Sequence, residues 1–310
     1  MKKNTKYDYL KITITIVTLG LLCFSGIGRD DIPMKRYSEF AKDSVFDCIG
    51  EVFDSKGRYI LSCVLIDNRF LLSSAHGFFK DSNTDVIDTI TVLNKRYPIK
   101  RPESTRLLDK SEFYFKFKNK KFKAKNIKIH PGYKDGFHSD GFNDIVVIEL
   151  NESISFINPA KLYTDTLEKG ARGIICGFGS NSKAIGRNSL FFSKRKKMAG
   201  ENIIDSFGGN LLNNSWGVLY ADMDNPKTTE CNRMGDHSPL PLEWHGDAGD
   251  CGGGLFILQN KEWRLAGISF APSYYADWEI YGRKYGTYGF IDGWTRISPL
   301  VIWIKSIVQN

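Results

Sequence analysis

Cysteine, proline and histidine are scarce in this chain, with 6, 10 and 5 residues of each among 310. So few prolines, together with 29 glycines, exclude a collagen-like protein, and no segment repeats at a fixed period. Disorder is excluded as well, because 42% of the residues are apolar and only 25% are charged. The composition indicates an ordinary globular protein with a substantial core.

A long apolar run is also missing, which argues against a membrane-spanning helix. The run from Ile12 to Phe24 is shorter than the roughly 20 residues that a span requires. Four lysines precede it and small residues follow it, which is typical of an export signal cleaved near Ser25 or Gly28. We therefore expect residues 1–26 to be a signal peptide and the mature protein to be secreted or periplasmic, without stable membrane insertion. An uncleaved anchor is the alternative.

The positive charge is too small to identify a partner. Lys and Arg number 43 against 35 Asp and Glu, and removal of residues 1–26 lowers the net charge from +8 to +5. The segment from Phe113 to Ile129 alternates Phe and Lys, which predicts a half-solvated hairpin in preference to a nucleic-acid surface. We therefore expect no nucleic-acid partner.

The cysteines leave an odd number after signal removal, because Cys23 lies in the signal. An odd cysteine in an exported protein points to a free, reactive thiol. Cys48 and Cys63 flank a predicted hairpin, where they either pair or remain two core thiols. A zinc site is the different-class alternative, but its candidate ligands are separated by 6, 8 and 6 residues and lack the usual close pair: Cys231, His237, His245 and Cys251. We expect no metal and no cofactor.

Short runs of β-branched and aromatic residues, separated by turn residues, predict an antiparallel sandwich or barrel protein. The runs are Cys48 to Phe53, Tyr59 to Ile66, Phe70 to Ser74, Ile90 to Leu93, Ile145 to Leu150, Gly173 to Gly177, Leu255 to Leu258 and Trp263 to Phe270. One convincing helix is predicted at the end, where Ser298 can cap and Pro299 fits the first turn. The polar stretch from Ser180 to Gly217 predicts a long exposed loop.

Three motifs occur in a fixed order: SSAHGF around His76, NDIVVIEL around Asp144, and GDCGGGLF from Gly249 to Phe256. This set resembles the chymotrypsin/trypsin family of endopeptidases, in which histidine, aspartate and nucleophile follow in the same order. The resemblance covers roughly residues 27–310. It implies an all-β fold of two antiparallel β-barrels with a C-terminal helix. Residues 27–160 would then form the first barrel, and residues 161–310 the second barrel and the helix.

The resemblance implies a catalytic triad of Cys251, His76 and Asp144. A nucleophile needs a base within hydrogen-bonding reach, and the base needs an acceptor on its other nitrogen. Cys251 stands where the family has serine, and a thiol is easily activated because a neighbouring imidazolium favours the thiolate. Viral cysteine proteases of this fold resemble the arrangement. The expected function is a secreted endopeptidase acting on proteins or peptides, and the alternative is an inactive relative that binds peptides.

The glycines around Cys251 favour the active interpretation. They permit a tight turn in which the backbone N–H groups of Gly249 and Cys251 point at a developing oxyanion. Asp250 matches the family aspartate that pairs with a newly freed N-terminal amine. Ile27 begins a segment that resembles the I-x-R-D-D start of some bacterial relatives, so processing before Ile27 would activate the enzyme.

The resemblance also places a specificity pocket. Its base lies six residues before the nucleophile, which is His245, and an imidazole there should disfavour Lys and Arg side chains. Ser269 and Phe270 resemble the strand that forms one wall and pairs with the substrate backbone. The following tyrosines and tryptophan would either cover the cleft or pack on the barrel: Tyr274, Tyr275, Trp278, Tyr281, Tyr285 and Tyr288.

Overall fold

The computed structural model describes residues 26–92, 95–133, 143–179, 182–184, 195–207, 217–235, 237–246, 249–270 and 286–309, with the side chains of 88–101 left aside. Apart from Gly26, the predicted signal peptide lies outside the described residues. None of the helices in these ranges is long and apolar enough to cross a membrane.

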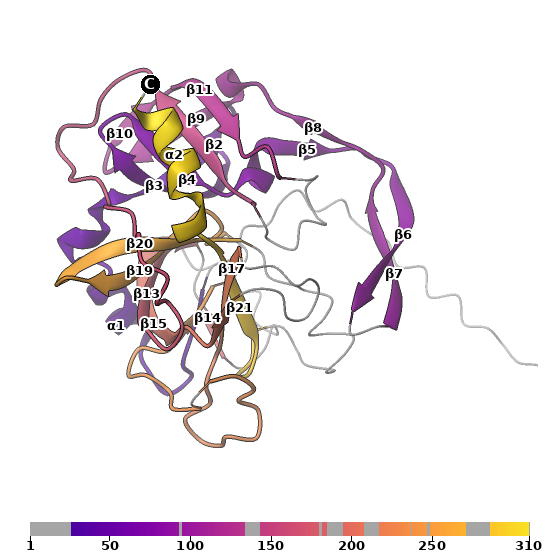
Figure 1. Cartoon of the computed structure of the whole chain (residues 1–310), viewed down its shortest axis with the longest axis vertical. Coiled ribbons are helices and arrows are strands. Elements are labelled where there is room, and N and C mark those ends of the chain that lie inside the picture. The colour runs from indigo at the N-terminus through magenta and orange to yellow at the C-terminus, as the bar shows by residue number, and fades with distance from the viewer. Residues whose placement is uncertain are drawn as a thin grey trace, which may run out of the picture.

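The first half of the chain forms a seven-stranded antiparallel sheet in the order β10-β9-β2-β3-β4-β12-β11 (Figure 1). Alternating apolar residues bury one face of these strands, as the Phe113, Phe115 and Phe117 series shows. The strands are β2 (Ile49–Asp54), β3 (Tyr59–Asp67), β4 (Phe70–Ser73), β9 (Phe113–Phe117), β10 (Lys120–Phe122), β11 (Ala124–Ile129) and β12 (Val146–Leu150).

The second half repeats this arrangement with the order β15-β13-β19-β20-β21-β17-β16. Its strands are β13 (Arg172–Gly179), β15 (Lys196–Ile203), β16 (Ser206–Phe207), β17 (Val218–Asp222), β19 (Gly254–Gln259), β20 (Glu262–Ser269) and β21 (Ile291–Arg296). Trp244 and Trp294 are fully buried in a cluster of this half. Another cluster joins Phe115 of the first sheet with Phe256 of the second, so the two halves share a core.

Smaller elements complete the structure. β1 (Ile27–Gly28) lies between β14 (Ser182–Lys183) and β18 (Trp244–His245) in a three-stranded sheet. Beside the first sheet, β5 (Phe79–Asp81) pairs with β8 (Thr105–Leu107), and β6 (Asp85–Val92) pairs with β7 (Lys95–Pro102) in a ribbon that extends away from the body (Figure 1). The helices are α1 (Met34–Phe40) and α2 (Val301–Val308), with 3₁₀ turns η1 (Ser44–Cys48), η2 (Ala75–Phe78), η3 (Lys110–Glu112) and η6 (Ser298–Leu300).

The architecture confirms the all-β class, with two antiparallel units and a helix at the C-terminus. The expected loop from Ser180 to Gly217 is wrong in part, because β15 runs through it and buries Met198 and Ala199. Ser298 does not cap the final helix, since its hydroxyl donates to Glu168 Oε1 at 2.7 Å. The short helix α1 lacked a sequence signal.

The cysteines of the described residues are all free thiols. In the β2–β3 pair, Cys63 stands opposite Gly50, so Cys48 and Cys63 do not face each other across the hairpin. Both are buried in the shared core, which fits the alternative of two core thiols. Burial raises the pKa of the Cys48 thiol to about 12, and it raises the pKa of Cys63 well above its usual value. These two thiols are therefore unreactive.

Candidate active site

The histidine and aspartate motifs meet because their strands are neighbours. β4 ends at Ser73 and leads into the η2 turn that carries His76, while Asp144 immediately precedes β12. β12 pairs antiparallel with β4, with Val146 opposite Ser73. The pairing therefore brings the end of one strand beside the start of the other, although 68 residues separate His76 from Asp144.

Asp144 holds His76 at two points. Its Oδ2 lies 2.7 Å from His76 Nδ1, and its Oδ1 accepts the backbone N–H of His76 at 3.0 Å. An ionised carboxylate only accepts hydrogen bonds, so Nδ1 carries the proton and Nε2 faces away from the acid. The Asp144 side chain is 3% exposed, whereas the His76 side chain is 25% exposed. The imidazole is thus fixed in orientation on one edge and accessible on the other.

Cys251 lies beside His76 and contributes to the pKa of that histidine through its charge and a side-chain hydrogen bond. Burial by itself lowers the pKa of His76, but the charges of Asp144 and Cys251 outweigh burial and raise this pKa well above its usual range. A histidine in this state readily holds the proton that the thiol gives up. The structure therefore brings the three predicted triad residues together.

The loop around Cys251 depends on glycine at two positions. Gly249 and Gly252 have φ values of 104° and 79°, which side chains other than glycine rarely adopt. A Cβ atom at Gly252 would also overlap the carbonyl oxygen of Ser62. Within the described part of the chain, the backbone N–H groups of Gly249 and Cys251 find no acceptor. They remain available for a developing oxyanion.

Strands from both halves hold this loop. The Ser62 N–H on β3 donates to the Cys251 carbonyl at 2.8 Å, and the Gly252 N–H donates to the Ser269 carbonyl on β20 at 2.8 Å. The Tyr59 hydroxyl donates to the Gly249 carbonyl at 2.7 Å and lies 3.0 Å from Ser62 Oγ. Sequence reasoning missed Tyr59, because a tyrosine at a strand start has no local signal for a contact 190 residues away.

The two residues assigned to activation are both buried, Ile27 to 1% and Asp250 to 2% exposure. Ile27 lies in β1 between Ser182 and His245, and the Asp250 carboxylate packs against Gly177. Their pairing after cleavage stays a prediction. In the intact chain, strand pairing already places the segment beside the predicted pocket.

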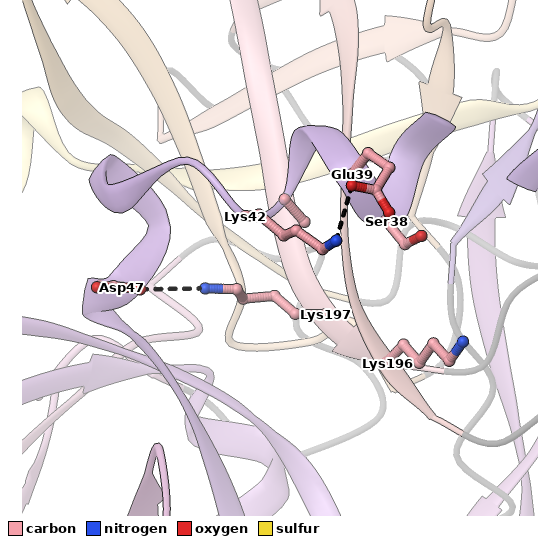
Figure 2. A pocket seen from close by; sticks show the side chains of 7 residues that line it. Ser38, Glu39, Lys42, Asp47, Lys196 and Lys197 are labelled. Carbon is pink, nitrogen blue, oxygen red and sulfur yellow. Dashed lines mark hydrogen bonds and ion pairs between the residues drawn. The ribbon is translucent and has the colours of Figure 1, made fainter. Parts of the chain in front are cut away.

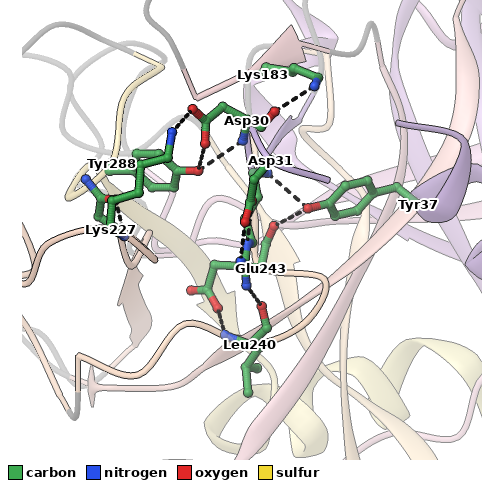
Figure 3. Close-up of polar contacts among 10 residues, drawn as sticks. Asp30, Asp31, Tyr37, Lys183, Lys227, Leu240, Glu243 and Tyr288 are labelled. Carbon is green, nitrogen blue, oxygen red and sulfur yellow. Dashed lines mark hydrogen bonds and ion pairs between the residues drawn. The ribbon is translucent and has the colours of Figure 1, made fainter. Parts of the chain in front are cut away.

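Asp30 anchors this N-terminal segment to three parts of the second half (Figure 3). Its carboxylate accepts from the Tyr288 hydroxyl at 2.7 Å and from Lys227 Nζ at 2.5 Å, and its carbonyl accepts from Lys183 Nζ at 2.7 Å. Tyr37 also connects this segment to the second half, because its hydroxyl donates to the Glu243 carbonyl at 3.0 Å. Tyr288 is 8% exposed, so this ring packs in the structure and does not cover a cleft.

The predicted pocket residues gather near the loop, together with a carboxylate that sequence reasoning missed. His245 is fully buried, and its nitrogens find no partner among the described residues. The centroids of the His245 and Phe290 rings lie 4.7 Å apart, with the ring planes inclined at 64°. The carboxylate is Asp292, which accepts the N–H groups of Gly246 at 2.6 Å and Gly293 at 2.8 Å. Burial raises the pKa of Asp292, and His245 opposes this shift.

The structure describes only some of the residues that were predicted to line the other wall of the specificity pocket. Ser269 and Phe270 are 2% and 3% exposed, and the Ser269 N–H donates to the Gly253 carbonyl at 2.9 Å. The other predicted cleft aromatics lie outside the described residues: Tyr274, Tyr275, Trp278, Tyr281 and Tyr285. Among the residues that the structure does describe, no three His, Cys, Asp or Glu side chains are arranged to hold a metal ion.

Comparison with known proteins shows that the fold resembles that of a solved protease structure. The structure is similar to neuropsin, a serine protease expressed in the limbic system of mouse brain. The TM-score is 0.52 at 16% sequence identity, and the alignment covers 91% of this chain and 98% of neuropsin. No family model matches the sequence. The similarity confirms the two-barrel fold with its C-terminal helix.

Proposed function

We propose that this protein is an exported endopeptidase that cleaves peptide bonds with Cys251, His76 and Asp144. The carrying observation is the position of the His76 imidazole, whose Nδ1 lies 2.7 Å from a buried carboxylate and whose pKa is raised by the neighbouring Asp144 and Cys251 side chains. Two backbone N–H groups beside that sulfur, which find no acceptor among the described residues, support the same chemistry. The similarity to a serine protease fold is consistent with it.

The reaction follows from these positions. The Cys251 sulfur attacks the carbonyl carbon, while the N–H groups of Gly249 and Cys251 stabilise the oxyanion. The C–N bond then breaks, and His76 gives its proton to the departing amine, leaving a thioester. His76 next removes a proton from water, whose oxygen attacks the thioester and releases the acid. The sulfur departs as thiolate, and His76 retains the proton beside it.

The exported location and the pocket preference belong to the same proposal. We expect His245, Ser269 and Phe270 to contact the side chain that precedes the cleaved bond. Asp292 adds a carboxylate there, but both its oxygens are engaged by backbone N–H groups and burial favours its neutral form. A pocket without a free anion should disfavour Lys and Arg. Strong cleavage after either residue in a mixed peptide library would contradict this preference.

A peptide chloromethyl ketone tests the function, because it alkylates an activated thiolate. We expect one adduct by mass spectrometry, mapped to Cys251, and hydrolysis of at least one peptide of a library. Both should disappear in Cys251→Ala, and His76→Ala should lower both by at least about a hundredfold. Cys231→Ala is the matched control, since this half-buried thiol lies outside the triad.

The inactive peptide-binding alternative gives a different result. A protein of that kind binds library peptides with the same affinity in the wild type and in Cys251→Ala, without adduct or cleavage. Cys251→Ser restores the nucleophile of the related proteases, and we expect at most partial activity because the site holds a larger atom. Hydrolysis that persists in Cys251→Ala would overturn the proposed nucleophile.

A further inference from the structure

A ladder of aromatic rings and cations leads outward from the Cys251 loop. We define the cation–aromatic ladder as Tyr59, Phe53 and Tyr114 with three of the cations that lie over them, Arg195, Lys121 and Lys123. A fourth cation, Lys116, lies 5.9 Å from the Phe53 centroid but is paired with Glu51 at 3.3 Å. The Phe53 and Tyr114 rings are stacked 5.0 Å apart at an interplanar angle of 6°, and Tyr59 meets the Phe53 ring edge-on at 5.8 Å. These rings belong to β2, β3 and the hairpin strand β9.

A cation lies over the ring at each end of the ladder. The Arg195 guanidinium lies 4.1 Å from the Tyr59 ring centroid and 5.6 Å from that of Phe53. Lys121 and Lys123 lie 4.6 Å and 5.9 Å from the Tyr114 centroid. All three cations are exposed. In the described part of the chain none of them has a carboxylate within ion-pair distance, so their charge is not neutralised.

The basic side chains of the neighbouring surface differ from those of the ladder in their ion pairing. Figure 2 shows the groove between α1 and β15, where Lys42 and Lys197 have acidic partners and Lys196 is drawn without one. Lys42 Nζ lies 2.7 Å from Glu39, and Lys197 Nζ lies 3.7 Å from Asp47. Lys118 shares Asp47 at 3.1 Å. Lys42 and Lys197 in this groove are therefore paired, whereas Lys196 has no carboxylate partner among the described residues.

The ladder begins at the catalytic loop. Tyr59, which lies under Arg195, donates its hydroxyl to the carbonyl of Gly249, one of the two proposed oxyanion residues. The acyl half of a substrate is expected along Ser269 on β20, which holds the loop through Gly252. β3 holds the loop through Cys251 and Gly249, so the leaving half of the substrate departs towards Tyr59 and Arg195.

We propose that the cation–aromatic ladder binds acidic side chains of the substrate on the leaving-group side of the cleaved bond. This inference rests on the proposed peptidase function. An extended peptide covers about 3.3 Å per residue, so about the second to the sixth residue after the cleaved bond lie within reach of Arg195 and Lys121. Carboxylates there gain from three cations that form no ion pair with the described acids, whereas lysines are repelled. The substrate class is thus proteins with an acidic segment after the cleavage point.

Two peptides test the ladder. They share an acyl half taken from a cleaved library peptide, and they carry either three aspartates or three asparagines at the third to fifth residues after the bond. For the wild type at low salt we expect kcat/KM to favour the aspartate peptide about tenfold, mostly through KM. The preference should shrink with added salt, because the contacts are exposed.

Variants locate the effect. Arg195→Gln combined with Lys121→Gln should bring the ratio of the two peptides close to one. The matched control is the combination of Lys42→Gln with Lys196→Gln, which removes the same charge from the neighbouring groove and should keep the ratio. A wild-type ratio near one, or a ratio that survives loss of Arg195 and Lys121, would overturn the inference.

Failure of the peptidase proposal is distinguishable from failure of the ladder. If the wild type cleaves neither peptide, fluorescence anisotropy measures binding of the two labelled peptides to Cys251→Ala. Tighter binding of the aspartate peptide, lost in the Arg195 and Lys121 double variant, would retain the ladder while the catalytic proposal falls. Equal binding of both peptides would remove the ladder as well.

Discussion

At the scale of single residues, one hydroxyl links the first half of the chain to the proposed oxyanion loop. The Tyr59 hydroxyl donates to the Gly249 carbonyl, and Ser62 Oγ beside it accepts the N–H of Phe178 at 2.9 Å. Gly249 has a positive φ and lies among glycines, so its peptide plane has little side-chain packing to hold it. The hydrogen bond from Tyr59 therefore orients the neighbouring N–H groups, which makes Tyr59 a positioning residue.

Tyr59→Phe removes the hydroxyl and keeps the ring. We expect kcat to fall about tenfold with little change in KM, because the oxyanion donors shift by a fraction of an ångström. Alkylation of Cys251 by iodoacetamide forms no oxyanion and should keep its rate. Tyr37→Phe is the control, since it removes a buried hydroxyl bonded at 3.0 Å to the Glu243 carbonyl and not to the Cys251 loop. An unchanged kcat in Tyr59→Phe would show that the loop holds itself.

At the scale of elements, local patterns predicted the strands that are short, mainly apolar runs beside clear turns, such as β3 and β4. Local patterns missed β15, because it begins with Lys196 and Lys197 and lacks a run of β-branched residues. Its Met198 and Ala199 are buried where it pairs with β13, a contact that the local sequence does not reveal. The motifs singled out His76, Asp144 and Cys251, which lie together in the structure, because each motif is local; their catalytic roles stay a prediction. Tyr59 and Asp292 act through contacts between distant segments, so no local pattern could reveal them.

One buried ion pair joins two elements of the second half. Arg296 at the end of β21 donates to Glu168 before β13 through two nitrogens, at 2.9 and 2.8 Å, and Ser298 adds a third bond to this carboxylate. Glu168 is completely buried and Arg296 is 6% exposed. A buried bidentate pair is costly to break because the remaining charge loses its partner without gaining water.

Glu168→Ala should therefore lower the free energy of unfolding by about 3 kcal/mol, measured by urea denaturation. The control is Glu262→Ala, which breaks a surface pair with Lys161 at 2.7 Å, where the two side chains are 46% and 61% exposed, and a second pair with Arg264 at 3.0 Å. This exposed pair should contribute less than about 1 kcal/mol. Equal losses in the two variants would mean that burial does not set the strength of these pairs.

At the scale of the whole molecule, the fold is stabilised without disulfides among the described cysteines. A shared core connects both halves, and a chain of this size buries enough surface to do without covalent links. Burial raises the pKa of Cys176 as it does for Cys48, so these core thiols resist oxidation. Oxidation should then affect function through Cys251 and leave the stability of the fold unchanged.

Adding a reductant tests separately whether oxidation affects the activity and whether it affects the stability of the fold. After purification in air, we expect dithiothreitol to restore peptidase activity several-fold, because a thiolate in an oxidising compartment forms sulfenic acid or a mixed disulfide that dithiothreitol reverses. The melting temperature should stay the same with and without reductant, since the described cysteines form no disulfide that reduction would break. Cys231→Ser is the control and should keep the dependence on reductant. A melting temperature that drops on reduction would reveal a stabilising disulfide. Full activity without reductant would show that Cys251 is protected from oxidation or is not the nucleophile.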